Sequence, residues 1–477
     1  MNTALLAIEE LLRFGLYHGL LDKFDIVQVR NELFSLLRID PGDVDEEYFI
    51  KSYSDITEHK TATLILKKIT DYFAERGYLS NNTITNRDLF EASVMGLLMP
   101  RQSEIISRFN EKYNISPREA TDDFYKICHA ANYIYTDRIN KNIYWTVITE
   151  YGTMELTVNL SKPEKDPKDI EAAKNAPVTS YPKCLLCLEN VGFSGHTAWP
   201  ARQNLRVIPV ILDGSQWYFQ YSPYAYYNEH CIILSERHKE MEITESTFVQ
   251  LLDFIRQFPH YFIGSNADLP IVGGSILSHE HFQGGRHIFP MEKSECRQFF
   301  YHPDFPGVNI GIVKWPLSVI RLSCNSSEDK LIKLAAEILN KWRLYSEGDI
   351  IAFSENTPHN TVTPIARKKD NRTELDLVLR NNRTTEEHPL GIFHPHAEWH
   401  HVKKENIGLI EVMGLAILPG RLESDIKEGR LEKEKISEIF VNVLKDCGVF
   451  KDNKEGQRRF EMFMNNIGLK PCIQENV

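Results

Sequence analysis

The chain has 477 residues, of which 42% are hydrophobic and 25% charged, and its formal net charge is -11. These proportions are typical of a soluble globular protein and exclude a disordered, collagenous or membrane chain. The acidic balance argues against a dedicated nucleic-acid binder, whose affinity would depend on Lys and Arg neutralising phosphates.

The compartment is predicted from the first residues and from the cysteines. The N-terminal stretch lacks a basic region and reaches Glu9 at once, so we expect no signal peptide. No apolar run approaches the roughly 20 residues of a spanning helix, and we expect no membrane partner. Eight cysteines in this length are too sparse for a disulfide framework. We therefore expect a reduced, cytoplasmic protein.

The N-terminal region, residues 1–160, is expected to be mainly helical. Hydrophobic residues recur at helical spacing within 5–20, 26–38, 59–76 and 87–112. Its last part, 143–160, alternates and is rich in Thr, Val and Tyr, which predicts strands. Residues 161–182 combine prolines and charges without periodicity and are interpreted as a linker.

Short β-type runs dominate after the linker. The first series lies at 205–212, 217–221, 230–234 and 309–322, with helical patterns at 243–258 and 328–346. The second series lies at 349–366, 374–380, 389–394 and 407–418, and an amphipathic helical pattern follows over 423–465. We interpret the series as two related units, 183–310 and 311–430, followed by a helical tail at 431–477.

Histidine is unevenly distributed, because 13 of the 17 lie between His230 and His401. Such density indicates metal ligation, catalysis or both. Cys184 and Cys187 form a Cys-x-x-Cys pair, which can chelate one zinc ion from a tight turn. A redox pair would need a helix after its first cysteine, and loop-type sequence follows instead. Two ordinary buried cysteines are the other alternative.

The segment 268–285 contains His279-Glu-His281-Phe-Gln283 between two glycine pairs. On a strand, His279, His281 and Gln283 would share one face. The glycines would let backbone N–H groups approach an anion. Neutral imidazole is a nucleophile and, once phosphorylated, a good leaving group, so the array favours covalent transfer at phosphorus. A solvated strand with incidental histidines is the alternative.

Motifs of several other enzyme classes are missing from the sequence. It contains no Gly-x-x-x-x-Gly-Lys-Ser/Thr, no Gly-x-Gly-x-x-Gly and no His-Glu-x-x-His. ATPase, dinucleotide-binding and common zinc-protease functions therefore lose support.

Several long motifs occur in one order that resembles a known family. They are Leu160-Ser-Lys-Pro-Glu-Lys-Asp-Pro, Tyr181-Pro-Lys-Cys, the segment 268–285, Thr357-Pro-His-Asn-Thr-Val-Thr-Pro-Ile-Ala-Arg367, Leu377-Val-Leu-Arg-Asn-Asn-Arg-Thr384 and Phe393-His-Pro-His396. The chain closely resembles the class II galactose-1-phosphate uridylyltransferases (UDP-glucose–hexose-1-phosphate uridylyltransferases) over nearly its whole length. Class I enzymes and the histidine-triad superfamily are similar more distantly. The resemblance implies an α+β fold, in which two histidine-triad-like units of antiparallel sheet follow the helical region.

The resemblance also implies a ping-pong nucleotidyl transfer. His281 would attack UDP-glucose and hold the uridylyl group, and galactose 1-phosphate would then take it. Gln283 would hold the phosphoryl oxygens, and an amide there suits transfer better than hydrolysis because it cannot act as acid or base. A hydrolase or phosphorylase of nucleotide derivatives, a nucleotide-sugar sensor and a zinc-stabilised interaction module are the alternatives.

Two metal sites are implied by similarity to class I enzymes, and no organic cofactor is. Zinc would be bound by Cys184, Cys187, His238 and His279. A second metal would take His394 and His396, together with Glu292 or Glu295. Hydrogen-bonded or surface histidines near a sugar-phosphate site are the alternative for the second group.

Substrate contacts are carried over more loosely from the family. Asn266 and either Ser275 or Ser278 match uridine contacts of the family. Ser222-Pro-Tyr224 stands where the family has a ribose-binding Asn-Asp-Phe, and this departure leaves the contact between Tyr224 and the ribose unsupported by the motif. Arginine forks match phosphate oxygens, so the pyrophosphate has the candidates Arg202 and Arg206. The hexose phosphate has the candidates Lys403, Lys404, Arg380 and Arg383. Solvated surface arginine is the alternative for each. Family members commonly form homodimers.

Overall fold

The computed structural model of the protein describes residues 3–40, 60–79, 81–161, 180–274 and 276–472. The chain forms two compact units. The first comprises Met1–Lys141, Ser161–Pro209 and Tyr218–Ala225, and the second Asn142–Leu160, Val210–Trp217 and Tyr226–Val477. Most of the expected linker lies outside the described residues. No helix in the described part of the chain is long and apolar enough to cross a membrane.

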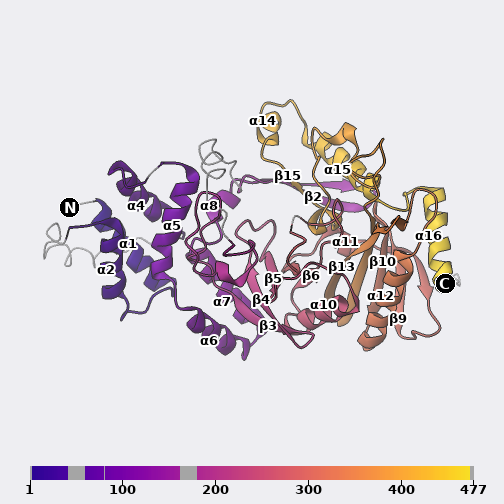
Figure 1. Ribbon diagram of the computed structural model, residues 1–477, viewed down its shortest axis with the longest axis horizontal. Coiled ribbons are helices and arrows are strands. Elements are labelled where there is room, and N and C mark those ends of the chain that lie inside the picture. Colours follow the sequence, from indigo (N-terminus) through magenta and orange to yellow (C-terminus); the bar gives the residue numbers. More distant parts are fainter. Residues whose placement is uncertain (1–2, 41–59, 80, 162–179, 275, 473–477) are drawn as a thin grey trace. The chain divides into compact units, whose positions relative to one another are not determined.

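The first unit is mainly helical, as expected (Figure 1). Its described helices are α1 (Thr3–Tyr17), α2 (Ile26–Leu37), α4 (Thr63–Glu75), α5 (Ile84–Leu98), α6 (Gln102–Tyr113), α7 (Pro117–Ala130) and α8 (Thr136–Ile139). The periodic stretch 87–112 becomes two helices because Pro100 cannot continue α5. Helix α7 has Pro117 in its first turn, and the Ser116 side chain accepts a hydrogen bond from the backbone N–H of Glu119.

An eleven-stranded sheet is the largest element among the described residues, and its pairings are antiparallel wherever the register is resolved. The strand order is β16-β8-β9-β10-β14-β13-β6-β7-β5-β4-β3. The strands are β3 (Ile208–Leu212), β4 (Ser215–Tyr221), β5 (Cys231–Ser235), β6 (Phe262–Gly264), β7 (His281–Gly285), β8 (Cys296–Tyr301), β9 (Val308–Val313), β10 (Val319–Cys324), β13 (Asn360–Lys369), β14 (Arg372–Asn381) and β16 (Lys470–Pro471). Helices followed by an antiparallel sheet confirm the predicted α+β class.

The same strand order occurs twice in this sheet. The first series is β3-β4-β5-β7-β6, with helix α10 (Glu245–Gln257) between β5 and β6 in the chain. The second is β8-β9-β10-β14-β13, with helix α12 (Glu328–Arg343) after β10. The two series meet where β6 pairs antiparallel with β13. Two structurally related units would produce this repeated strand order. The boundaries 183–310 and 311–430 stay predictions.

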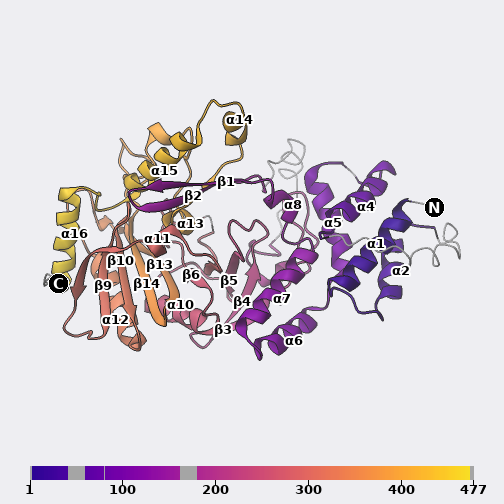
Figure 2. The ribbon, with the colours of Figure 1, turned by 180° about the vertical axis from the view of Figure 1, so that it is seen from behind.

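Two layers cover the sheet of the second unit. Helices α10 and α12 lie side by side and contact β13 (Figures 1 and 2). On the other face, a hydrophobic core joins the sheet to a smaller sheet and to a helix. These elements are β1 (Ile143–Thr149), β2 (Gly152–Val158), β15 (Leu415–Leu418) and α15 (Lys433–Cys447). Leu156, Val319, Val378 and Phe440 are buried together in this core. Strands β1 and β2 were predicted from alternation.

The strand expected at 389–394 is wrong, because this segment forms turns. Pro389 donates no ladder hydrogen bond, and Gly391 adopts a φ of 119°, which is costly for other residues. The run 407–418 is also divided: a short helix α13 (Leu409–Val412) precedes β15, and Gly414 with a φ of 100° separates them. The C-terminal pattern forms three helices, which are α14 (Leu422–Lys427), α15 and α16 (Lys454–Asn466).

A buried charge network connects three strands of the second series. Arg321 on β10 binds both carboxylate oxygens of Asp376 on β14, at 2.7 and 2.9 Å. Arg367 on β13 binds Asp376 at 2.9 Å and Glu374 at 2.6 Å. Burial would raise the pKa of Asp376, but the two arginines hold it at about 2. The carboxylate therefore stays charged inside the sheet.

Replacing Asp376 should strongly destabilise the fold, since Asp376→Asn leaves two buried guanidinium groups without their shared carboxylate. We expect the free energy of unfolding to fall by about 3 kcal/mol or more. Chemical denaturation measures this, with Glu455→Gln as the control. Glu455 pairs with Arg458 on the surface, and its loss should leave the free energy of unfolding nearly unchanged because solvent screens exposed pairs. Equal effects of the two substitutions would contradict the role of the network.

Candidate functional site

His281 begins strand β7 and lies 6% exposed. Its Nδ1 lies 2.8 Å from the backbone carbonyl of His279. Because a carbonyl only accepts, Nδ1 carries the proton, and in the neutral ring Nε2 keeps a free lone pair. Burial lowers the pKa of His281 to about 4, which favours the neutral ring. Nε2 makes no hydrogen bond to a described residue, so it is available as a nucleophile.

Gln283 lies two residues along β7 and shares a face with His281, as expected. His279 does not share this strand, because β7 starts at His281 and His279 lies in the segment before it. Gln283 is half-buried, and its Oε1 lies 3.2 Å from Nε2 of His230. Phe282 points away from these residues and stacks on Trp217 at 4.8 Å.

His230 was missed by the sequence reasoning as a site residue. It immediately precedes β5, and the register that places Ile232 opposite Gln283 brings it near the site. Burial lowers its pKa to about 4 although the hydrogen bond to Gln283 opposes this effect. The uneven distribution of histidines was the only signal in the sequence, and it did not distinguish His230 from its neighbours.

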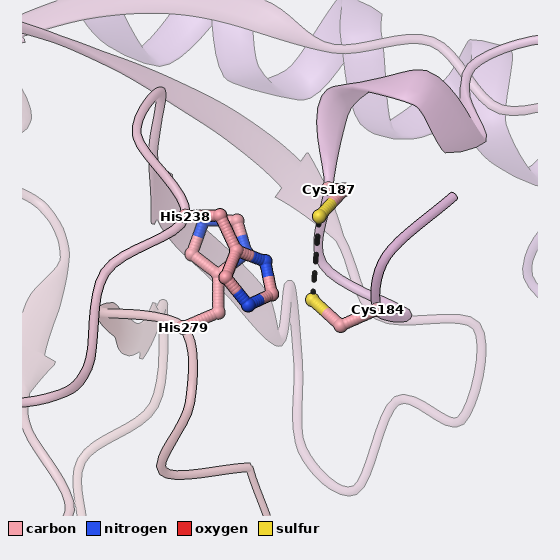
Figure 3. Close-up of side chains that lie close together, drawn as sticks. All are labelled: Cys184, Cys187, His238 and His279. Carbon is pink, nitrogen blue, oxygen red and sulfur yellow. Dashed lines mark hydrogen bonds between the residues drawn. The ribbon is translucent and has the colours of Figure 1, made fainter. Parts of the chain in front are cut away.

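The predicted zinc ligands form one group (Figure 3). One ligand atom from each of Cys184, Cys187, His238 and His279 lies within 4.8 Å of the others. The two sulfur atoms are 3.5 Å apart, and the two imidazole centroids 4.9 Å apart. The part of the chain that the structure describes contains no other group of three or more such ligands.

The chemistry of this group fits a tetrahedral metal ion. Zinc bonds of about 2.0–2.3 Å separate neighbouring ligand atoms by about 3.3–3.8 Å, close to the spacing of the sulfurs. His279 Nε2 donates to the carbonyl of Ser235 at 2.8 Å, which leaves Nδ1 as the ligand atom and supplies the second-shell hydrogen bond common at such sites. Burial raises the pKa of Cys187 to about 11. A bound cation would lower that pKa again, because it stabilises the thiolate.

Packing accounts for the glycines around this segment without an anion. A Cβ on Gly273 would lie 2.3 Å from the carbonyl of Ala267, and one on Gly274 would lie 2.6 Å from Nδ2 of Asn266. Gly284 and Gly285 lie within β7. A Cβ on Gly284 would lie 2.7 Å from the backbone of β6, and one on Gly285 would lie 2.7 Å from the Tyr227 ring. Their role in admitting a phosphate therefore stays a prediction.

The candidate uridine contacts differ in their surroundings. Asn266 follows β6, is 4% exposed, and its Oδ1 accepts a hydrogen bond from the backbone of Leu409 at 2.9 Å. Ser278 is exposed beside the buried His279. Ser275 lies outside the described residues. Asn266 therefore stabilises the connection between β6 and α13, and its free amide hydrogens lie beside Gly274.

Residues expected at the pyrophosphate or ribose have other contacts in the first unit. Arg206 is buried, and its guanidinium donates to the carbonyls of Pro100, Gln203 and Leu205. Burial lowers its pKa to about 10. Arg202 is half-buried, with its guanidinium carbon 5.5 Å from the centroid of Tyr133. Tyr224 is half-buried, and its backbone N–H donates to Ser222 at 3.4 Å.

The two arginines expected at the hexose phosphate are held by backbone carbonyls. Arg380 is 1% exposed and donates to Ile407 at 2.9 Å, while its Nε and one terminal nitrogen have no hydrogen-bond partner among the described residues. Arg383 is half-buried and donates to Asp349 at 3.0 Å.

The candidate second metal ligands are already hydrogen-bonded. His394 contacts the carbonyl of Pro395 and the side chain of Asn406, both at 3.1 Å. His396 lies 3.4 Å from Asp446, which sequence reasoning did not select. Neither histidine belongs to a group of three ligands in the described residues. Glu292 faces Arg367 instead, at 3.9 Å.

Comparison with known proteins places these features in a family. Residues 43–240 match the N-terminal domain of galactose-1-phosphate uridyl transferase, and residues 254–443 match its C-terminal domain. The galactose-1-phosphate uridylyltransferase of Caldanaerobacter subterraneus subsp. tengcongensis is 51% identical, over 97% of this chain and 98% of the relative. That of Bacillus subtilis is 48% identical, over 98% and 99%.

Solved structures include a more remote neighbour. The crystal structure of yeast Ap4A phosphorylase Apa2 aligns with 72% of this chain and 97% of its own, at 10% identity and a TM-score of 0.39. The two family matches together cover most of the sequence, and the two bacterial relatives cover nearly all of it. The chain belongs to the galactose-1-phosphate uridylyltransferase family.

Proposed function

We propose that the protein exchanges a uridylyl group between UDP-glucose and galactose 1-phosphate through a covalent uridylyl-histidine. Family membership supports the exchange activity. The observation that carries the covalent route is the His281 side chain, whose Nδ1–H is bound to a backbone carbonyl and whose Nε2 is left free. A fixed nucleophile of this kind can divide one difficult transfer into two easier steps.

In the first step, Nε2 of His281 attacks the α-phosphorus of UDP-glucose. The bond from that phosphorus to the bridging oxygen breaks, glucose 1-phosphate leaves, and the uridylyl group remains on nitrogen. A phosphate oxygen of galactose 1-phosphate then attacks the same phosphorus, which forms UDP-galactose and restores the imidazole. The His279 carbonyl accepts Nδ1–H throughout and stabilises the positive charge of the uridylylated ring.

Gln283 stabilises the phosphoryl oxygens on the same face of β7. Its amide can donate hydrogen bonds to the negative charge on these oxygens. It cannot deliver or remove a proton, and so it gives an attacking water molecule no general base. This difference favours transfer to a phosphate, which is already an anionic nucleophile, over the alternative hydrolase function.

The four ligands Cys184, Cys187, His238 and His279 would hold a structural zinc ion. Bound zinc supplies rigidity rather than reaction chemistry at this position. His279 would connect the metal to the reaction, since its own carbonyl accepts the hydrogen bond from His281. The ligand would thus fix the backbone that sets the orientation of the nucleophile.

The remaining substrate contacts stay proposals, which rest on the family resemblance and on the chemistry of the side chains. The uridine would be contacted by Asn266, Ser278 and Ser275, and the ribose by Tyr224. The pyrophosphate would be contacted by Arg202, and the hexose phosphate by Arg380 and Arg383. The hydrogen bonds of Arg206 to three carbonyls favour a structural role for that residue instead. A homodimer and a cytoplasmic location are also proposed.

His281→Ala should abolish exchange while the fold survives, because the variant loses the nucleophile but no buried charge pair. We expect a loss of at least about 10⁴-fold in kcat, measured as UDP-galactose formed from UDP-glucose and galactose 1-phosphate. Circular dichroism and thermal unfolding confirm folding, and His281→Gly with uridylyl-imidazolide should recover transfer. Near-normal exchange by His281→Ala would sink the mechanism.

Incubation with UDP-glucose alone distinguishes the alternative function. The transferase should release about one glucose 1-phosphate per site and then stop, because the uridylyl group waits for an acceptor. Steady release of UMP would favour a hydrolase.

Metal analysis of the purified protein should find about one zinc ion per chain, since two thiolates and two imidazoles form a complete tetrahedral set. His238→Ala removes an exposed ligand and should lower the zinc content without disturbing the core. His196→Ala, at a histidine outside the ligand group, is the control. A metal-free wild-type protein that remains folded and active would remove zinc from the account.

A further inference from the structure

We propose that His230 is a positioning residue that fixes the amide of Gln283, so that its NH2 group faces the phosphoryl oxygens at His281. The inference rests on the proposed function for its catalytic consequence. The hydrogen bond that it requires, from His230 to Gln283, can be measured without any turnover.

The strand register brings the two side chains together. Strands β5 and β7 are antiparallel neighbours, and Ile232 lies opposite Gln283. His230, two residues before Ile232, lies on the same face as Gln283 because side chains alternate along extended chain. Diagonal neighbours on one face of a sheet are within reach of long side chains. The contact of 3.2 Å between His230 Nε2 and Gln283 Oε1 is of this kind.

The buried surroundings determine the direction of this hydrogen bond. His230 is 3% exposed, and its Nδ1 has no hydrogen-bond partner among the described residues. If Nε2 accepted from the Gln283 amide, Nδ1 would carry a buried and unpaired N–H. If Nε2 donates to Oε1, only a lone pair on Nδ1 is unpaired. Orphaned buried N–H groups are rare in proteins, whereas unfilled acceptors are better tolerated, so the donating tautomer is favoured.

Packing prevents His230 from rotating out of this arrangement. Its ring lies 4.6 Å from the ring of Tyr227 and 5.4 Å from that of Tyr226. Tyr227 is itself bound to β7, since its hydroxyl donates to the carbonyl of Gly284 at 3.1 Å. Strand β7, which carries the nucleophile, therefore also holds the tyrosine ring that packs against His230.

The direction of this hydrogen bond decides what Gln283 offers to substrate. With Oε1 bound to His230, the amide hydrogens are its only polar groups left for a ligand. In the flipped amide, the carbonyl oxygen would face the phosphoryl oxygens and repel their negative charge. His230 excludes that orientation before substrate arrives, which is how a preorganised donor lowers the barrier to transfer.

His230→Phe tests this role, since it keeps a ring but removes the donor. We expect kcat for exchange to fall about tenfold to a hundredfold, which is at or below the loss of about 10²–10³ for removing an oriented donor outright, because Gln283 itself remains. KM for UDP-glucose should stay within about twofold. His302→Phe is the matched control, at a buried histidine that follows β8, and its kcat should stay normal. Unchanged kcat in a folded His230→Phe variant overturns the proposal.

A double-substitution cycle separates positioning from general damage. If His230 acts through Gln283, adding His230→Phe to Gln283→Ala should lower the single-turnover rate by less than about twofold. An undiminished loss in that background would show that His230 acts by another route and would contradict the proposal.

The tautomer of His230 can be read directly by 15N NMR on histidine-labelled wild-type protein, assigned with His230→Phe. The proposal predicts a protonated Nε2 and a bare Nδ1 for His230, and a shift of the Nε2 signal in Gln283→Leu. A protonated Nδ1 overturns it whether or not the protein transfers uridylyl groups. Failure of exchange by the wild type with the predicted tautomer would contradict the proposed function alone.

Discussion

The hydrogen bond from Nδ1 of His281 to the carbonyl of His279 is the constraint on which the proposed chemistry depends. It connects residues only two apart in sequence, and it decides which ring nitrogen holds the lone pair. Without it the buried imidazole could place its proton on either nitrogen. The ladder of β7 with β5 and β6 fixes one end of this short segment. The His279 ring, bound to Ser235, fixes the other.

The two series of the sheet carry different polar groups on their strands. In the first series, β7 carries His281 and Gln283. In the second, Glu374 and Asp376 on β14 form buried ion pairs with Arg367 on β13 and Arg321 on β10, and these pairs stabilise the sheet. The five strands of the second series contain no histidine. The repeated strand order thus offers a strand histidine as nucleophile in the first series only.

Sequence patterns predicted the features that depend on local spacing. Helical periodicity and strand alternation identified most described elements, and two histidines and a glutamine at alternate positions identified the reactive segment. The cysteine spacing, with the family resemblance, selected a ligand group that the structure brings together. Each of these signals lies within a few residues or within one motif.

Features that depend on tertiary packing were not predictable from one sequence. The role of His230 follows from the register of β5 against β7, which no local pattern contains. Arg206 is of a residue type that often binds phosphate, but three backbone carbonyls accept its hydrogen bonds. The turns at 389–394 replaced an expected strand because Pro389 and Gly391 interrupt an otherwise apolar run.

Intact and peptide mass spectrometry after mixing the protein with UDP-glucose tests the central claim most directly. A histidine whose Nε2 is free and neutral should retain the uridylyl group, because the first step is complete before the acceptor binds. The account predicts a mass increase of one uridylyl group per chain, located on the peptide that contains His281 and lost on adding galactose 1-phosphate. An unmodified His281 in protein that is actively exchanging substrate would contradict it.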